Sequence, residues 1–354
     1  MYPNLMKGAH VQVGGSISRR AALGVLGGAG AIALTGRAMG LGAPGGGPAV
    51  GGVGGGDPGV ENANVYRRRV GEVEVFAISD GTGLNLGSPY PLWGANTGKE
   101  SVEGALGVDL LPVVDTRFYF NATFVRAGGL KILVDLGNKG NAPGSGQLVK
   151  GLNSIGVKPG DIDVVIFSHL HPDHFGGLFD GPKEAPTIAF PNARYFVHKD
   201  EVDFWSHADK GSIRGQIPEA FKEGMLAGAS ATLKLLAGRL EKNDSTLKLV
   251  PGLTIEPLPG HTPGHQTVRV ASGDEQILIM ADAVHHPSLS FRNPSMHLQF
   301  DVDPEVGAKS RLAFVQRAQA EKMLVLGYHM PFPGIGRVAK DGEGFRWVPE
   351  GWWW

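Results

Sequence analysis

The chain contains 354 residues, enough for one large domain or two ordinary ones, and 42% of them are hydrophobic, so a sizeable core is possible. Its formal net charge of −1 gives no electrostatic reason to expect a nucleic acid as partner. It contains no cysteine, which excludes disulfides, thiolate catalysis and zinc sites built on sulfur. Any metal bound here must therefore use nitrogen and oxygen ligands.

The N-terminal segment predicts export rather than a folded domain. Arg19 and Arg20 precede an uncharged run of Ala, Gly and Leu that ends near Gly36, which is the twin-arginine export pattern. This run is too short and too rich in glycine to span a bilayer about 30 Å thick. A Gly/Pro-rich linker follows, which cannot bury enough apolar surface to fold. We therefore expect a periplasmic or secreted protein with an export signal over residues 1–40, a linker over 41–61 and a single domain over 62–354.

Strands dominate the first half of the predicted domain. Val73–Ser79 alternates like a strand, and Phe118–Arg126 and Lys131–Val134 flank a two-glycine hairpin signal. The continuous apolar stretch Ile162–Phe167 predicts a strand that is buried on both faces. The remaining predicted elements of this half are a short helix and another strand, at Gln147–Leu152 and Arg194–His198.

Two helices and four strands are predicted in the second half. A segment rich in Ala, Leu and Lys predicts a helix over Glu219–Glu241, and Asp303 followed by Pro304 predicts the start of a helix that extends to about Glu321. The four predicted strands are Leu253–Leu258, Gln266–Val270, Gln276–Met280 and Met323–Leu326. Strands in both halves, with helices between some of them, predict sheets covered by helices.

Histidine and aspartate residues recur just past the ends of four predicted strands, at His169, His261, Asp282 and His329. In sheet proteins with helical crossovers, ligands and catalytic groups collect at that edge. Imidazoles and carboxylates are the ligands that borderline and hard divalent metals prefer. The pattern therefore indicates a metal site at one edge of the sheets.

The stretch Ser168–Gly177, SHLHPDHFGG, places three histidines and an aspartate within six positions. His169 and His171 are two residues apart and can point the same way, whereas Asp173 and His174 follow a proline turn and can point elsewhere. One segment can therefore supply ligands to two metal ions. The alternative is a polar loop in which Asp173 caps a helix. It is disfavoured because FGGLFDG is a poor helix and ligand-type residues recur downstream.

Taken together, the motifs resemble the metallo-β-lactamase superfamily. Residues 169–174 match its HxHxDH signature, and the later ligand motifs follow in order at Gly260-His261, Asp282 and His329. The motifs AISDGT, GHTPGH and FPGIG are most similar to those of the methyl parathion hydrolases and their lactonase and aryl-esterase relatives. The resemblance extends roughly over residues 66–349.

This resemblance implies an α/β fold, an αββα sandwich of two mixed β-sheets flanked by helices, with two divalent ions at one edge. Zinc is the expected metal, with manganese, cobalt and iron as alternatives. The family pattern assigns His169, His171 and His261 to the first ion, Asp173, His174 and His329 to the second, and Asp282 to both as a bridge. Asp173 and Asp282 are in addition the two expected catalytic residues.

A ligand set of this kind favours hydrolysis. A metal can lower the pKa of water from roughly 16 to about 7, so a water that bridges two cations supplies hydroxide at neutral pH. The same ions polarise a carbonyl or phosphoryl oxygen and absorb the charge that develops on it. We therefore expect an exported dinuclear-metal hydrolase that cleaves a lactone or aryl ester with a metal-bridging hydroxide, with organophosphate hydrolysis as a further activity.

By position, four residues resemble the apolar pocket lining of methyl parathion hydrolases, namely Leu84, Leu86, Trp205 and Phe300. Packing in the hydrophobic core is the alternative interpretation for each of them. His285 is predicted either as a pocket acid, base or hydrogen-bond donor or as a surface histidine, and His265 is expected to support the metal ligands. The loop GNKGNAPGSG after Asp135 lacks a pocket aromatic, which argues for a lactone or ester over an aromatic phosphotriester.

Other interpretations stay open at this point. A thioesterase of the glyoxalase II kind uses a similar ligand set, although no added basic C-terminal module for glutathione is evident. A periplasmic metal-binding protein without turnover is the alternative from a different class, and the complete ligand set argues against it. The terminal Trp352-Trp353-Trp354 is compatible either with a docking element of a homodimer or with a frayed end.

Overall fold

The computed structural model describes residues 63–83, 87–114, 117–142 and 144–351. The chain divides into two units, Met1–Val60 and Glu61–Trp354. The predicted export signal and linker lie outside the described residues, and so do Leu84, Leu86 and the three terminal tryptophans. Among the described helices, none combines the length and the apolar character that a bilayer crossing requires.

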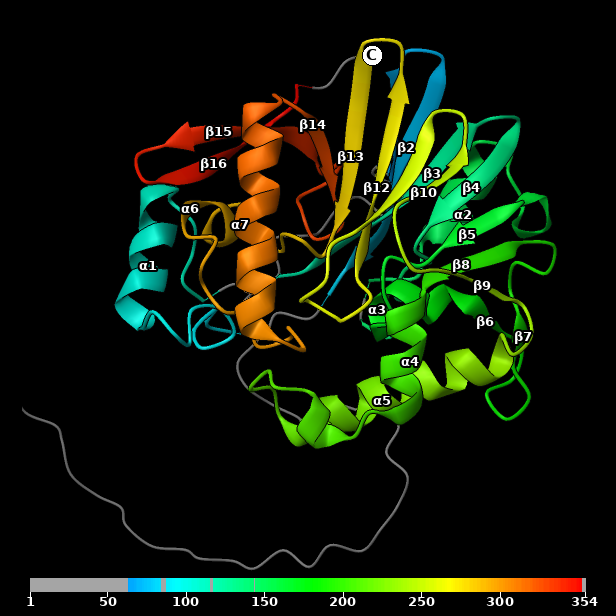
Figure 1. Cartoon of the computed structure of the whole chain (residues 1–354), viewed down its shortest axis with the longest axis horizontal. Coiled ribbons are helices and arrows are strands. Elements are labelled where there is room, and N and C mark those ends of the chain that lie inside the picture. The colour runs from blue at the N-terminus through cyan, green and yellow to red at the C-terminus, as the bar shows by residue number, and fades with distance from the viewer. Residues whose placement is uncertain (1–62, 84–86, 115–116, 143, 352–354) are drawn as a thin grey trace, which may run out of the picture. The chain divides into compact units, whose positions relative to one another are not determined.

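Two seven-stranded mixed sheets form the framework of the domain (Figure 1). The first sheet contains, in spatial order, β1 (Val65–Val70), β2 (Val73–Thr82), β3 (Tyr119–Ala127), β4 (Leu130–Val134), β5 (Val164–Ile166), β8 (Arg194–His198) and β9 (Leu240–Asn243). Neighbouring strands are antiparallel from β1 to β4 and parallel from β4 to β9.

The second sheet contains, in spatial order, β10 (Leu247–Val250), β11 (Leu253–Pro257), β12 (Gln266–Ser272), β13 (Glu275–Ala281), β14 (Leu324–Gly327), β15 (Ile335–Asp341) and β16 (Gly344–Pro349). All its neighbours are antiparallel except β13 and β14, which are parallel. A short ribbon of β6 (Phe179–Asp180) and β7 (Thr187–Ile188) lies apart from both sheets.

The described helices are α1 (Lys99–Val108), α2 (Leu148–Ser154), α3 (Pro172–Phe175), α4 (Lys199–His207), α5 (Glu219–Leu235), α6 (Leu289–Arg292) and α7 (Pro304–Ala320). Three short 3₁₀ turns, η1 (Pro159–Asp161), η2 (Gly176–Leu178) and η3 (Lys210–Ser212), connect other elements. The Asp303 side chain accepts a hydrogen bond from the N–H of Val306 at 3.1 Å, so α7 begins where its capping residue and following proline predict.

The two sheets pack face to face through apolar side chains. Val75 of β2 and Ile132 of β4 belong to the same buried cluster as Val268 of β12 and Ile279 of β13. Successive residues of a strand point to opposite faces, so Phe76, next to Val75, joins a second buried cluster on the outer side of the first sheet. Both faces of the sheets are therefore covered, which is why their central strands read as continuous apolar runs.

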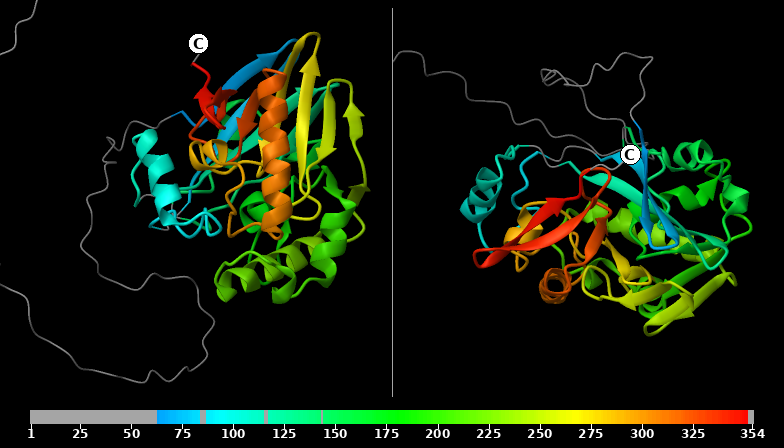
Figure 2. Two further views of the ribbon diagram at one scale, coloured as in Figure 1. Left: turned by 60° about the vertical axis from the view of Figure 1, so that its left-hand side comes forward. Right: turned by 90° about the horizontal axis from the view of Figure 1, so that it is seen from above.

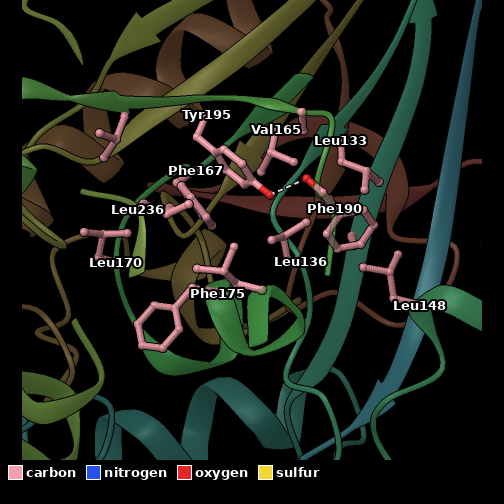
Figure 3. Packing of buried hydrophobic residues seen from close by; sticks show 14 of the residues in the cluster. Leu133, Leu136, Leu148, Val165, Phe167, Leu170, Phe175, Phe190, Tyr195 and Leu236 are labelled. Carbon is pink, nitrogen blue, oxygen red and sulfur yellow. Dashed lines mark hydrogen bonds between the residues drawn. The ribbon is translucent and has the colours of Figure 1, made fainter. Parts of the chain in front are cut away.

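Helices cover the outer face of each sheet. Trp205 of α4 and Met225 of α5 pack in one cluster with Phe167 and Tyr195, part of which Figure 3 shows. The Tyr195 hydroxyl donates a hydrogen bond to the carbonyl oxygen of Phe190 at 2.7 Å, so this buried polar atom is satisfied (Figure 3). On the other side, α7 runs along the second sheet and buries residues such as Phe314 against it (Figure 2). The predicted αββα sandwich is confirmed.

The main error of the sequence-based element boundaries concerns the helix expected over Glu219–Glu241. The helix α5 ends at Leu235, and β9 begins at Leu240. Gly238 between them has φ of 76°, a left-handed conformation that glycine adopts without a Cβ clash. The segment 240–243 then pairs in parallel with β8, and this pairing overrides the local helix propensity. The sequence did not predict the strands β1, β6, β7, β9, β10, β15 and β16 or the helices α1, α3, α4 and α6.

Candidate metal centre

The predicted metal ligands follow strands of both sheets. His169 comes after β5 of the first sheet, whereas His261, Asp282 and His329 come after β11, β13 and β14 of the second. The carboxyl ends of these strands meet at one edge of the sandwich. Residues of both sheets are therefore brought to a single site that neither sheet contains alone.

Two groups of side chains meet at this edge, and within each group one ligand atom per residue lies within 4.8 Å of the others. We call them the first group, which is His169, His171 and His261 together with Asp282, and the second group, which is Asp173, His174 and His329. The structure thus brings together the three histidines assigned to the first ion and the three residues assigned to the second, and it groups Asp282 with the first set only. A further group that meets the same distance criterion contains His261, His285 and Asp301.

Asp282 contacts members of both groups. Its Oδ2 lies 3.2 Å from Nε2 of His261 and 3.2 Å from Nε2 of His329, and its Oδ1 lies 3.2 Å from Nε2 of His174. Burial alone would raise the pKa of Asp282, but the surrounding histidines outweigh it and hold the pKa well below its usual range. Asp282 is therefore a charged carboxylate placed between the two groups.

Four of the histidines use Nδ1 for a contact with the protein. Nδ1 of His169 lies 3.0 Å from the Ser168 hydroxyl, and Nδ1 of His261 lies 2.8 Å from Oδ1 of Asp301. The same holds for His174 and His329, whose Nδ1 atoms lie 2.8 Å from Asp135 and from the Tyr119 carbonyl oxygen. A partner at Nδ1 fixes the ring and leaves Nε2 as the atom available to a metal.

This donor set fits two divalent ions. Nε2 of His169, Nε2 of His174 and Oδ1 of Asp282 are buried and have no well-aligned hydrogen-bond partner within the described residues. Leaving such an atom unpaired costs about 1–3 kcal/mol, and a cation would satisfy it. Nδ1 of His171 lies 2.9 Å from Nε2 of His261. Two nitrogens that share a tetrahedral zinc lie about 3.3 Å apart, which is close to that spacing.

Protonation of the first group follows from its surroundings. Burial, and after it the neighbouring histidines, hold the pKa of His169 and of His171 well below the usual range. Burial lowers the pKa of His261 as well, but Asp282 and Asp301 more than offset it and raise the pKa to about 9. A cation bound between these rings would displace that proton, because metal ligands must be deprotonated.

His265 holds the backbone of Asp282 in place. The N–H of Asp282 donates to Nε2 of His265 at 3.1 Å, and Nδ1 of His265 donates to the carbonyl oxygen of Leu258 at 2.9 Å. The ring is therefore neutral, and its burial lowers the pKa of His265 to about 3. This contact gives His265 the supporting position that the sequence predicted.

The loop that carries His261 is packed between two helices, and its two glycines permit this. A Cβ at Gly260, where φ is 134°, would lie 2.4 Å from the backbone nitrogen of Gly307 in α7. A Cβ at Gly264 would lie 2.3 Å from the backbone nitrogen of Glu201 in α4. Real Cβ atoms essentially never approach other atoms within 3.0 Å, so only glycine allows both helices to touch this loop.

A buried ion pair supports His261. Asp301 contacts His261 through Oδ1 and accepts from the Arg311 guanidinium through Oδ2 at 2.9 Å. Burial would raise the pKa of Asp301, but Arg311 and His261 hold it at about 2. The other guanidinium nitrogens of Arg311 donate to carbonyl oxygens, among them Ala283 at 3.3 Å and Met296 at 2.6 Å. Arg311 thus connects α7 to the segment that follows Asp282.

Asp135 supports the second group from the end of β4. Its Oδ2 lies 2.8 Å from Nδ1 of His174, and the carboxylate also accepts from the backbone N–H of Ser168 at 2.8 Å and from its hydroxyl at 2.7 Å. Asp135 has φ of 60°, which is uncommon for a residue other than glycine and is typical of functional sites.

Tyr328 packs directly against the second group. Its ring stacks on His174 with centroids 3.9 Å apart, and its hydroxyl donates to the carbonyl oxygen of Asp173 at 2.5 Å. The next residue, His329, is held by the Tyr119 carbonyl oxygen of β3. The second group is therefore supported by strand ends and their immediate neighbours.

The structure places the predicted pocket residues in different environments. His285 lies at the centre, with Nε2 3.2 Å from Oδ2 of Asp282, and burial lowers the pKa of His285 to about 4. Phe300 is half-buried beside other aromatic rings. Trp205 belongs instead to the hydrophobic core, where 3% of it is exposed and its indole N–H donates to Glu201 at 2.6 Å. It packs under His171 rather than on an open wall.

A row of aromatic rings leads away from His329, and of its members the sequence analysis assigned only Phe300 to the pocket. The Phe118 ring meets His329 edge-on at 5.0 Å, stacks on Trp93 at 5.3 Å and lies 6.1 Å from Phe300. Phe300 in turn lies 6.0 Å from Phe221 of α5, which is 48% exposed. We call Trp93, Phe118, Phe300 and Phe221 the aromatic row. Each comes from a different part of the chain, so no local pattern could have indicated it.

Residues 115–329 match a family model described as the Metallo-beta-lactamase superfamily. An N-acyl homoserine lactonase of Bacillus thuringiensis is 26% identical over 256 residues, which are 72% of this chain and 85% of the relative. An N-acyl homoserine lactonase of a Bacillus species is 27% identical over 233 residues, or 65% of this chain and 78% of the relative.

Solved structures of similar fold exist as well. AidC, described as a dizinc quorum-quenching lactonase in complex with a product, superposes with a TM-score of 0.75 and 27% identity, covering 82% of this chain and 98% of that chain. The hydrolase AbOPH, described as a member of the beta lactamase superfamily, gives a TM-score of 0.72 and 24% identity, and the match covers 83% of this chain and 99% of that chain. The latter likeness concerns the fold alone.

Proposed function

The chain belongs to the metallo-β-lactamase superfamily, and on this premise we propose that it is a two-metal hydrolase that opens lactones carrying an apolar substituent. The superfamily and the fold expected from the motifs are confirmed, and the protein is a metal-dependent hydrolase. The observation that supports the substrate class most is the aromatic row, which begins against a ligand histidine, His329. The relatives named N-acyl homoserine lactonase also favour a lactone.

The first group would hold one ion and the second group the other, with Asp282 available to both, and the proposed metal is zinc. When bound, two such ions ionise a water molecule at neutral pH and stabilise negative charge on the scissile carbonyl oxygen. Zinc is preferred because the donors are imidazoles and carboxylates and because a similar structure is described as a dizinc enzyme.

Asp173 and His285 are the residues that we place against the substrate. The Asp173 side chain is 27% exposed, whereas the six other ligand residues are each at most 5% exposed, so its carboxylate is the ligand that substrate and water can reach. Its Oδ2 is placed to accept a proton released in the reaction. His285 is neutral, and neither of its ring nitrogens has a hydrogen-bond partner among the described residues, so it can offer one N–H to an ester oxygen of the substrate.

The aromatic row is placed to bind the apolar substituent. An acyl chain or aryl group attached to the scissile carbonyl would lie along Phe118 and Phe300 toward the exposed end of the row at Phe221. Aromatic side chains bury large apolar areas, and each methylene of substrate in such contact contributes about 1–3 kcal/mol of discrimination. Substrates with long acyl chains should therefore be preferred to short ones.

A substrate panel on zinc-saturated enzyme tests this proposal. We expect kcat/KM for an N-acyl homoserine lactone, dihydrocoumarin or phenyl acetate to exceed that for methyl parathion. A ratio below one would identify an organophosphate hydrolase, and preference for a glutathione thioester would identify a thioesterase of the glyoxalase II kind. Absence of turnover on every substrate, after chelation and refilling with zinc or manganese, would identify a metal-binding protein without catalysis.

We also propose that the enzyme is exported by the twin-arginine pathway, because Arg19 and Arg20 precede the apolar run described above. Replacement of both arginines by lysine should retain the protein in the cytoplasm, as measured by cell fractionation. Unchanged export of that variant would contradict this localisation.

A further inference from the structure

Glu201 is a fully buried carboxylate for which the catalytic proposal has no role. It lies in the first turn of α4, is 0% exposed and forms no ion pair among the described residues. Buried charges are costly unless hydrogen bonds replace the lost water. The contacts of this side chain therefore indicate why it is present.

Four donors surround the Glu201 carboxylate. Oε1 accepts from the backbone N–H of Leu170 at 2.8 Å and from the Trp205 indole at 2.6 Å. Oε2 accepts from the Thr262 hydroxyl at 2.6 Å and from the backbone N–H of Gly264 at 3.0 Å. Burial raises the pKa of Glu201, and these hydrogen bonds lower it in part. Because all four partners are donors, the arrangement suits an ionised carboxylate, which is an acceptor only.

These contacts reach both segments that carry the first group. Leu170 lies between His169 and His171, and Thr262 directly follows His261. The first segment follows β5 of one sheet, whereas the second follows β11 of the other. One oxygen of Glu201 holds the first segment and the other oxygen holds the second, so the carboxylate bridges the two sheets at the place where their ligands must converge.

The second group does not depend on these contacts. Its residues are held by Asp135, by the Tyr119 carbonyl oxygen and by Tyr328, and none of these is a recorded partner of Glu201. Asp173 and His174 lie in α3, where the N–H of Leu136 donates to the carbonyl oxygen of His174 at 2.8 Å. Within the described residues, Glu201 therefore supports only the first group, whereas Asp135 contacts His174 directly and also reaches His169 through the Ser168 hydroxyl.

We propose that Glu201 is a positioning residue that sets the affinity of the ion held by the first group and leaves the ion held by the second group unaffected. The inference rests on the two-ion part of the proposed function and deepens it. Polar residues that orient metal ligands typically change metal affinity by about 10–100-fold when they are replaced.

The test is zinc binding to metal-free Glu201→Gln, measured by competition with a chromophoric chelator. An amide has one acceptor oxygen and one donor group, so it must abandon the two donors on one side of the carboxylate. We expect one of two zinc ions to bind about 10–100-fold more weakly than in the unchanged chain, and the other to bind equally well.

Three further variants make the result specific. Thr262→Val removes one donor to Glu201 and should weaken the same ion by a smaller factor, which keeps the test valid if Glu201→Gln does not fold. Tyr328→Phe removes the hydroxyl that donates to the Asp173 carbonyl oxygen and should weaken the other ion, and the double variant Glu201→Gln/Tyr328→Phe should weaken both. Glu74→Gln is the matched control, because both Glu74 oxygens also have partners, Arg67 and Arg126, but these lie outside the centre.

Binding of both ions by Glu201→Gln as in the unchanged chain would overturn the inference, and so would equal weakening of both. An unchanged chain that binds fewer than two zinc ions would overturn the two-ion part of the proposed function instead. An unchanged chain that binds two zinc ions and opens no lactone would overturn the proposed substrate and leave the role of Glu201 standing.

Discussion

The two ligand groups meet at Asp282 and both contact the Asp135–Ser168 pair, but their other supports come from different layers of the sandwich. The first group depends on the outer helices, since Glu201 comes from α4 on one face and Arg311 from α7 on the other (Figure 1). The second group depends on the inner strands, through Asp135 at the end of β4 and the Tyr119 carbonyl oxygen of β3.

This difference has an energetic consequence. The supports of the first group include buried charges on helices, Glu201 of α4 and Arg311 of α7, whose partners lie mainly in loops. A shift of either helix would therefore leave a buried charge without its partners. The supports of the second group sit on strands that the sheet hydrogen bonds already hold in register. We therefore expect the first ion to respond to perturbation of the helical layers, and the second to respond mainly to changes at the strand ends.

Replacement of Asp282 should affect both ions, because this carboxylate contacts members of both groups. Asp282→Asn keeps the size of the side chain and removes its charge, so the fold should persist while retention of at least one ion is lost. We expect kcat/KM for a lactone to fall by more than about 100-fold, the upper range for residues that only support ligands. Metal analysis and circular dichroism check both parts. Two tightly held ions with unchanged turnover would contradict the shared role.

Replacement of Arg311 should affect the first group and the stability of the domain. Arg311→Met leaves His261 as the remaining cationic partner of Asp301 in the metal-free protein, and breaking a buried ion pair costs at most about 3–5 kcal/mol of unfolding free energy. Urea unfolding of the metal-free protein measures the loss. Asp301→Asn/Arg311→Met should restore part of it, because no charge is then left unpaired. A loss below about 1 kcal/mol in the single variant would show that the ion pair does not support this layer.

Replacement of Phe300 should separate substrate binding from metal binding. Phe300→Ala interrupts the aromatic row next to Phe118, which borders His329 of the second group. We expect kcat/KM for a long-chain lactone to fall by about 10-fold or more, while the value for a short-chain lactone changes little. Zinc content serves as the control and should stay constant. Equal losses for both chain lengths would place the acyl chain elsewhere.

Removal of residues 1–61 should have the smallest effect. The sequence predicts that they serve export and tethering, so a chain that starts at Asn62 should bind zinc in both groups and turn over a lactone at the rate of the full chain. Size-exclusion chromatography and zinc stoichiometry measure this. An unfolded shortened chain beside a stable full-length chain would show that the domain boundary is misplaced.

The sequence by itself predicted strands, covering helices and the candidate ligand residues, whereas the αββα sandwich followed from the resemblance of its motifs to the superfamily. His and Asp recur after apolar strands, and both the strands and these residues are local patterns that can be read without knowing their neighbours. The sequence did not predict the helix α4, because its segment KDEVDFWSH is short and largely polar and shows no clear helical period of apolar residues. The positions of Glu201 and Trp205 on a helix were therefore not predicted. Trp205 was assigned to the pocket, whereas the structure places it in the hydrophobic core.

Only the tertiary structure decided what surrounds the ligands. Glu201, Asp301 and Arg311 are single polar residues in separate elements, and their role arises from partners that approach through packing of helices on opposite faces. The aromatic row likewise combines lone rings from separate parts of the chain. Ligand identity is a property of short segments, whereas orientation and pocket shape are properties of contacts between distant segments, which is why the first could be predicted and the second could not.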